Sequence, residues 1–143
     1  MSVPPLRDDI GFLLSRASGL VVRSTNEALA EDGLRVRQYS VLVLACGGAD
    51  GISQRDLAGQ LGLDPSQVVL LVDDLATAGL VERRPSPSDR RTKLVAATAR
   101  GRAALCRAAD RAAAGQQRRL GRLSDAEQAT LRDLLTRLVV PPD

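Results

Sequence analysis

The chain has 143 residues, which is enough for one domain with its own core and too few for two. Its 44% apolar and 26% charged residues are typical of a globular protein. It has neither the ~18 consecutive apolar residues of a membrane span nor a secretory signal, so we expect a cytoplasmic protein with no membrane partner. Because it contains no histidine and only two separated cysteines, Cys46 and Cys106, the sequence disfavours a metal site, a cofactor and an enzyme.

The net charge of +3 is unevenly distributed along the chain. Residues 1–80 carry 6 basic and 10 acidic side chains, whereas residues 81–122 carry 12 basic and 3 acidic ones. This local excess of positive charge indicates either a polyanion partner or a solvated basic face of a helix.

The first part of the chain is predicted to be helical. Apolar residues recur there at steps of three and four, which predicts one amphipathic helix over about 6–31 that stops at Gly33. A long helix near a terminus often packs on a partner chain. A second helix is predicted over about 36–46, followed by a glycine-rich loop over 47–51.

Two capping motifs predict a pair of helices in the middle of the chain. Ser53 is expected to cap a short helix. Asp64 is expected to cap the next one, with Pro65 in the first turn and Gln67 reaching back, and this helix stops at Gly79. Two helices joined by a tight turn form a helix-turn-helix, a motif that also occurs in proteins that do not bind DNA.

The remainder of the chain is predicted to be a hairpin and two helices. The strands lie over about 80–84 and 92–97, around a proline-rich turn at 85–89. A long helix is expected over about 99–120. The capping box Ser124–Glu127 then opens a last helix with a stripe of leucines.

A hairpin directly behind a helix-turn-helix forms a winged helix, and the tip of this wing is basic. The residues at and beside the tip are Arg83, Arg84, Asp89, Arg90, Arg91 and Lys93. Such a tip suits phosphates and the negative potential of a narrow minor groove. Asp89 is expected to hold the Arg90 guanidinium through a bidentate pair. The alternative is a solvated hairpin with a surface salt bridge.

Several segments resemble the MarR family of bacterial winged-helix regulators, and the resemblance extends over about residues 6–139. The segments that carry it are Gln38–Leu42, Leu71–Leu75, Gly79–Pro85, Asp89–Arg91, Thr98–Gly101 and Leu123–Glu127. The wing is the most specific of them. The sequence departs from the family pattern at Leu70 and Asp74, where many relatives carry arginine. The predicted recognition helix, over 65–78, therefore contains no basic residue.

The resemblance implies a fold that is mainly α with a small β-hairpin, formed by a single domain over residues 1–143. A winged helix-turn-helix lobe (about 34–98) would lie between long dimerisation helices at both ends (about 6–31 and 101–140). It also implies a homodimer whose two wings straddle one DNA duplex. A twofold dimer predicts a pseudo-palindromic operator in double-stranded DNA, with half-sites about one helical turn apart.

The candidate DNA-binding residues lie at the starts of two helices and in the wing. Gln67, Val69 and Leu70 are expected to meet base edges, the last two through thymine methyl groups. Arg90 is expected to enter the minor groove, and most of the others to contact the phosphate backbone. The full set is Ser53, Gln54, Pro65, Ser66, Gln67, Val69, Leu70, Arg84, Asp89, Arg90, Arg91 and Lys93.

The resemblance further implies a small aromatic or lipophilic effector, bound between the dimerisation helices and the lobe. The candidate lining residues are Phe12, Arg16, Tyr39 and Val43, and Arg16 is placed to pair with an anionic ligand. Because Phe12 and Tyr39 are the only aromatic residues, the alternative is that both lie in the core.

The sequence thus predicts a homodimeric, sequence-specific DNA-binding transcriptional regulator, a repressor that a small effector releases from DNA. Two alternatives stay open. A thiol-based redox sensor would use Cys46 or Cys106, and arginines near Cys106 favour its thiolate if it is exposed. A winged-helix protein-interaction module that has lost DNA binding is favoured by the recognition helix without basic residues.

Overall fold

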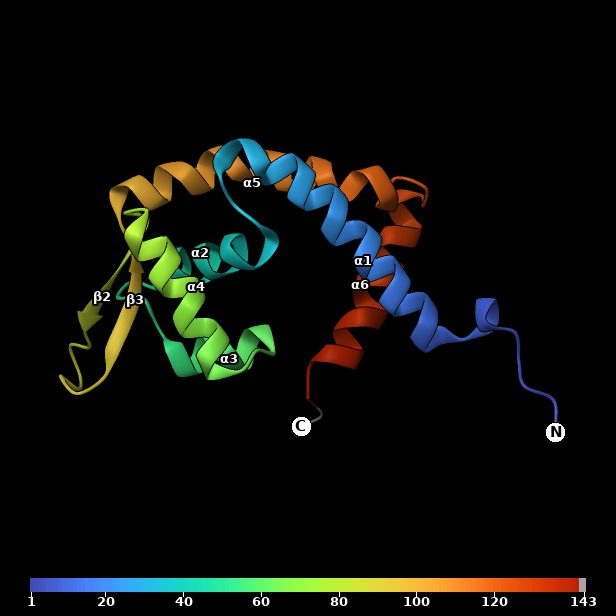
Figure 1. Ribbon diagram of the computed structural model, residues 1–143, viewed down its shortest axis with the longest axis horizontal. Helices are drawn as coiled ribbons and strands as arrows, with labels where there is room; N and C mark the ends of the chain where they lie inside the picture. The colour runs from blue at the N-terminus through green and yellow to red at the C-terminus, as the bar shows by residue number, and fades with distance from the viewer. Residues whose placement is uncertain (142–143) are drawn as a thin grey trace.

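The computed structural model describes residues 1–141. A lobe of short helices and strands lies at one end of a pair of long helices, and the chain ends lie at the other end (Figure 1). The helices are α1 (Ile10–Leu29), α2 (Val36–Gly47), α3 (Gln54–Leu61), α4 (Pro65–Thr77), α5 (Ala99–Leu120) and α6 (Asp125–Val139). The strands are β1 (Ile52–Ser53), β2 (Val81–Pro85) and β3 (Lys93–Ala97). A mainly helical winged helix-turn-helix is therefore confirmed.

The sheet has three strands, in the order β1-β3-β2: the predicted hairpin of β2 and β3 is confirmed, and a third strand that the sequence did not predict joins it. The missed strand is β1, in which Ile52 pairs with Val95 and Ser53 pairs with Leu94 in antiparallel register. A strand of two residues is too short to show the alternation of apolar and polar side chains by which a strand is recognised in a sequence. The pairing matters because it brings the start of α3 beside the wing.

The first helix is shorter than predicted. A separate 3-10 helix, Leu6–Asp8, comes before it, and the Asp9 carboxylate accepts a hydrogen bond of 2.7 Å from the Phe12 backbone N–H, which caps α1 at Ile10. At the other end α1 gives way at Leu29 to a 3-10 turn that ends at Gly33 in a left-handed conformation. The expected stop at Gly33 is confirmed, whereas the continuous helix over 6–31 is wrong.

The core lies inside the lobe and is aliphatic. Seven of its fully buried side chains come from four elements of the lobe, and Leu29 adds the end of α1. They are Leu29, Val41, Leu42, Leu57, Val68, Val72, Leu75 and Val95. Because α4 contributes three of them, its remaining face is fixed outward.

The two long helices α1 and α5 cross through a row of small residues. Ala104, Ala108, Ala112 and Gly115 of α5 are all buried. A Cβ atom added at Gly115 would lie 2.8 Å from Thr25 Cα, so only glycine fits at the crossing. The Ser24 hydroxyl donates a hydrogen bond of 2.7 Å to the Gly115 carbonyl oxygen. Helix α5 is therefore a tightly packed element that the lobe and the long helices share.

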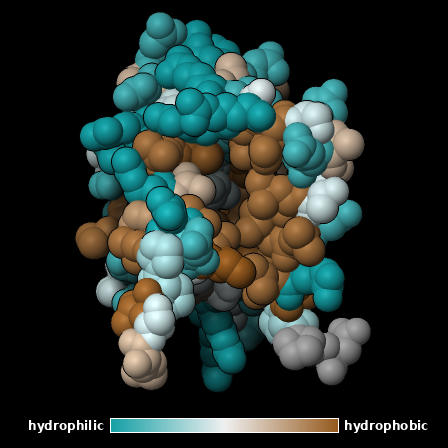
Figure 2. Space-filling model, turned by 90° about the vertical axis from the view of Figure 1, so that its right-hand side faces the viewer, coloured by the Kyte–Doolittle hydropathy of each residue, from teal (hydrophilic) through white to brown (hydrophobic). Residues whose placement is uncertain are grey.

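An apolar surface runs along the helices away from the lobe, on the side shown in Figure 2. Several of its exposed apolar side chains come from the segment before α1, from α1, and from α6 and the residue after it. They are Leu6, Ile10, Leu13, Leu14, Leu134, Leu138, Val139 and Val140. None of the helices in the described part of the chain is both long and apolar enough to span a membrane.

We predict that Gly115→Ala lowers the free energy of unfolding by about 2 kcal/mol, because the added methyl group meets backbone atoms of α1. Gly59→Ala in α3, where nothing lies within 4 Å of the added atom, is the matched control and should stabilise by about 0.5–1 kcal/mol. Chemical denaturation measures both. Equal stability of the Gly115 variant and the native chain would contradict the tight crossing.

Candidate nucleic-acid interface

The outer face of α4 combines polar ends with an apolar centre. At its start the Gln67 side-chain oxygen accepts a hydrogen bond of 3.2 Å from the Asp64 backbone N–H, as the capping motif predicts. Gln67 keeps only its N–H donors for a base edge. Ser66, Val69 and Leu70 are all exposed, and Leu70 is 65% exposed. This is the face that a recognition helix turns toward DNA.

The wing tip is held by Asp89, but not in the predicted way. Its carboxylate accepts hydrogen bonds from the Arg91 backbone N–H at 3.0 Å and from the Thr92 hydroxyl at 3.2 Å. The expected pair with the Arg90 guanidinium is therefore wrong, since the carboxylate is bound within its own turn. Asp89 fixes the shape of the loop and leaves the exposed Arg90 side chain free to reach out at the tip.

Arg83 connects the wing to both helices of the helix-turn-helix. Its Nε–H donates to Gln54 Oε1 at 2.9 Å, and its Nη2 lies 2.6 Å from Asp73 Oδ1 on α4. The neighbouring Arg84 forms an ion pair with Glu82 on the same strand. Arg83 thus neutralises the acidic side chain on the outer face of α4, a role that the sequence did not reveal.

A basic groove of about 650 Å³ lies between the start of α3 and the wing. Its lining has four basic residues and no acidic one: Ser53, Gln54, Arg55, Arg83, Arg91, Thr92 and Lys93. The structure brings together four predicted residues (Ser53, Gln54, Arg91 and Lys93) and adds Arg55. Sequence reasoning missed Arg55 because its position beside the wing depends on the β1–β3 pairing.

Two polar side chains of the groove are partly engaged within the protein, and the remaining donors in the groove are basic or amide groups. The Ser53 hydroxyl is engaged in capping α3, where it accepts from the Asp56 backbone N–H at 3.0 Å. The Gln54 oxygen is engaged by Arg83, so its amide N–H groups are left as donors. With Arg55, Arg91 and Lys93 these donors form a positive track from the helix start to the wing tip, next to the outer face of α4.

The predicted effector residues are separated along two helices. Phe12 and Arg16 are exposed on α1, while Val43 is exposed and Tyr39 is half-buried on α2. The core alternative therefore fails for Phe12 in a single chain. A pocket of about 440 Å³ lies nearer the lobe, between α1, α2 and α4. It is lined by Val22, Asn26, Arg35, Val36, Arg37, Gln38, Leu71 and Asp74.

The two cysteines are both free thiols. Burial raises the pKa of the Cys46 thiol above its ordinary value, and this effect outweighs the opposing effect of the nearby Arg102 cation. A raised pKa reduces the thiolate population at neutral pH and with it the reactivity of Cys46. Cys106 is exposed on α5.

The exposed face of α4, the basic wing and the basic groove together define a winged-helix DNA-binding protein. A model of the MarR family matches residues 32–92. The structure of CouR from Rhodococcus jostii RHA1 bound to p-coumaroyl-CoA is 49% identical and superposes with a TM-score of 0.91, covering 99% of each chain. A MarR-family transcriptional regulator from Rhodococcus sp. RHA1 is 47% identical, with a TM-score of 0.90 over 98% of this chain and 100% of that one.

A transcriptional repressor, also named CouR and solved on a 23-mer DNA duplex, is 30% identical. It has a TM-score of 0.85 and covers 98% of this chain and 99% of its own. The chain belongs to the MarR family of transcriptional regulators. These relatives are named as transcriptional regulators, and one of them was solved on DNA.

We predict that Arg83→Ala weakens DNA binding about tenfold, because it removes a cation and leaves Asp73 as an uncompensated anion on the DNA-facing helix. Adding Asp73→Asn to this variant should recover about threefold. Fluorescence anisotropy with a labelled duplex measures the cycle. If the double variant binds as weakly as Arg83→Ala, Asp73 is not the group that Arg83 neutralises.

Proposed function

We propose that the protein is a homodimeric repressor that reads a pseudo-palindromic operator and leaves it when an acidic aromatic effector, of the aryl-CoA thioester class, binds. The observation that carries DNA binding is the basic groove beside the exposed face of α4. The likeness to a repressor solved on a DNA duplex supports it.

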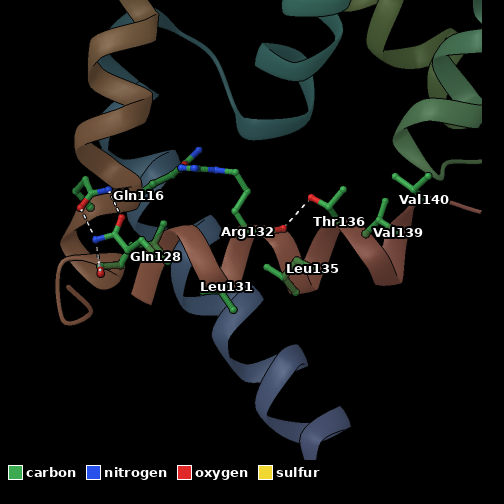
Figure 3. A pocket seen from close by; sticks show the side chains of 10 residues that line it. Gln116, Gln128, Leu131, Arg132, Leu135, Thr136, Val139 and Val140 are labelled. Carbon is green, nitrogen blue, oxygen red and sulfur yellow. Dashed lines mark hydrogen bonds between the residues drawn. The ribbon is translucent and has the colours of Figure 1, made fainter. Parts of the chain in front are cut away.

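The dimer is supported by the apolar surface of α1 and α6. A groove of about 480 Å³ runs along α6, lined by Leu131, Leu135 and Val139 together with Gln116 of α5 (Figure 3). An apolar surface of this extent on a small protein marks a contact with another chain. A second copy, presenting the exposed leucines before and within α1, is the occupant we propose. Twofold symmetry then places two lobes on one duplex.

The proposed dimer determines the form of the operator. Random duplexes enriched on the protein at about 150 mM salt should converge on a palindrome with half-sites about ten base pairs apart. Arg90→Ala should weaken binding across sequences and lower the slope of log affinity against log salt by about 1. Arg122→Ala, between α5 and α6 and far from the wing, is the matched loss of an exposed cation. Failure of folded, dimeric protein to enrich any duplex would favour the protein-interaction module instead.

The effector site is supported by the pocket between α1, α2 and α4. Its apolar wall includes Val22, Val36 and Leu71, which suits an aromatic group. Arg35 and Arg37 stand at the same pocket without a salt bridge in the described part of the chain, which suits carboxylate or phosphate. The 49% identical CouR was solved with p-coumaroyl-CoA, a ligand that combines both features.

The pocket also offers a route from effector to DNA. Leu71 and Asp74 belong to α4, the same helix that carries Leu70 on its outer face. The predicted residues Tyr39 and Val43 continue along α2 from Val36, so we propose that they extend the aromatic subsite toward the α1 residues Phe12 and Arg16. A ligand wedged between α1, α2 and α4 favours one spacing of the two lobes over another.

We predict that p-coumaroyl-CoA releases the protein from its operator and that Arg35→Ala with Arg37→Ala raises the concentration needed by at least about tenfold, because two charge-assisted contacts are lost. The concentration of free p-coumaric acid needed for release should rise less in this double variant. Arg119→Ala with Arg122→Ala, at the end of α5 and outside the lining of this pocket, is the matched loss of two exposed cations. If the double variant is released at the same concentration of the CoA thioester as the native protein, the phosphates of this ligand bind elsewhere.

A further inference from the structure

We propose that Leu70, flanked by Val69, makes the protein read thymine through its C5-methyl group in the major groove. This inference rests on the proposed DNA-binding function. It assigns the apolar centre of α4 a specific partner, the methyl group that distinguishes thymine from the other bases in that groove.

The packing of α4 fixes the direction of Leu70. Val68, Val72 and Leu75 are buried, and with 3.6 residues per turn Leu70 points directly away from them. Its 65% exposure exceeds the 37% of Val69, and every other valine, leucine and alanine of this helix is buried or half-buried. Leu70 therefore contributes little to the core and lies where a base edge would lie.

Two of the polar side chains around Leu70 are partly engaged within the protein. Gln67 uses its carbonyl oxygen to cap the helix, and Asp73 uses a carboxylate oxygen to bind Arg83 at 2.6 Å. No residue of α4 is basic, so the helix has no arginine to read guanine through its O6 and N7 acceptors. Apolar contact is the main readout that the centre of this face retains.

The surroundings identify the occupant. The Arg83 side chain joins α4 to the basic groove, so the apolar centre is continuous with the phosphate-binding track of the same interface. A protein partner of ordinary charge would have to desolvate these cations, whereas DNA neutralises them while placing base edges against α4. A thymine methyl group then fills the surface over Leu70 and removes both apolar groups from water.

The test compares chemically matched operators. In the enriched duplex each thymine of a half-site is replaced in turn by deoxyuridine, which deletes only the methyl group. We expect one position per half-site at which affinity falls about fourfold, and about fifteenfold when both half-sites are changed. At that position 5-methylcytosine should bind tighter than cytosine by a similar factor.

The side chain is tested on the same duplexes. Leu70→Ala should bind the thymine and deoxyuridine operators equally well, while its thermal unfolding stays close to native because Leu70 is outside the core. Thr77→Ala, exposed at the end of the same helix face, should keep the native preference.

Three results would overturn the assignment. They are a half-site without thymine, equal binding of thymine and deoxyuridine operators by the native protein, and a methyl preference that survives Leu70→Ala. Each of these three results leaves the proposed DNA-binding function intact. Retention of no duplex at all would instead remove the proposed function and this readout together.

Discussion

Helix α5 approaches its neighbours more closely than any side chain allows, and the whole architecture depends on these two contacts. A Cβ atom at Gly101 would lie 1.9 Å from the Leu80 carbonyl oxygen, and one at Gly115 would lie 2.8 Å from Thr25 Cα. The first contact seats α5 on the start of the wing, and the second seats α1 on α5. One rigid helix therefore ties the DNA-facing lobe to the apolar surface on which we propose that a second copy docks.

Charge and shape belong to different parts of the proposed DNA-binding surface. The groove beside the wing carries the cations that we propose bind phosphate, whereas α4 carries no cation and presents Leu70 at its centre. Affinity then depends on salt through the wing, while sequence preference depends on close contact with base edges. Arg83 couples the two parts, because it holds Gln54 and Asp73 from a strand of the wing.

Local signals in the sequence predict much of this fold. The caps at Ser53, Asp64 and Ser124 and the stop at Gly33 act over a few residues, and the structure confirms each of them. The misses depend on contacts between distant segments or on competing partners. Strand β1 exists only because β3 lies beside it, and Arg55 enters the basic groove only through that pairing. The Asp89 carboxylate accepts hydrogen bonds from the Arg91 backbone N–H and the Thr92 hydroxyl of its own turn instead of pairing with the Arg90 guanidinium.

The central claim is that two copies place α4 in the major groove and the wing in the minor groove of one duplex. Footprinting of the enriched operator with hydroxyl radicals and with dimethyl sulfate tests it most directly. We predict two blocks of major-groove protection about one helical turn apart, each flanked on its outer side by a protected minor groove, and loss of only the flanking protection in Arg90→Ala. A single protected block, or flanks that persist in that variant, would contradict this arrangement.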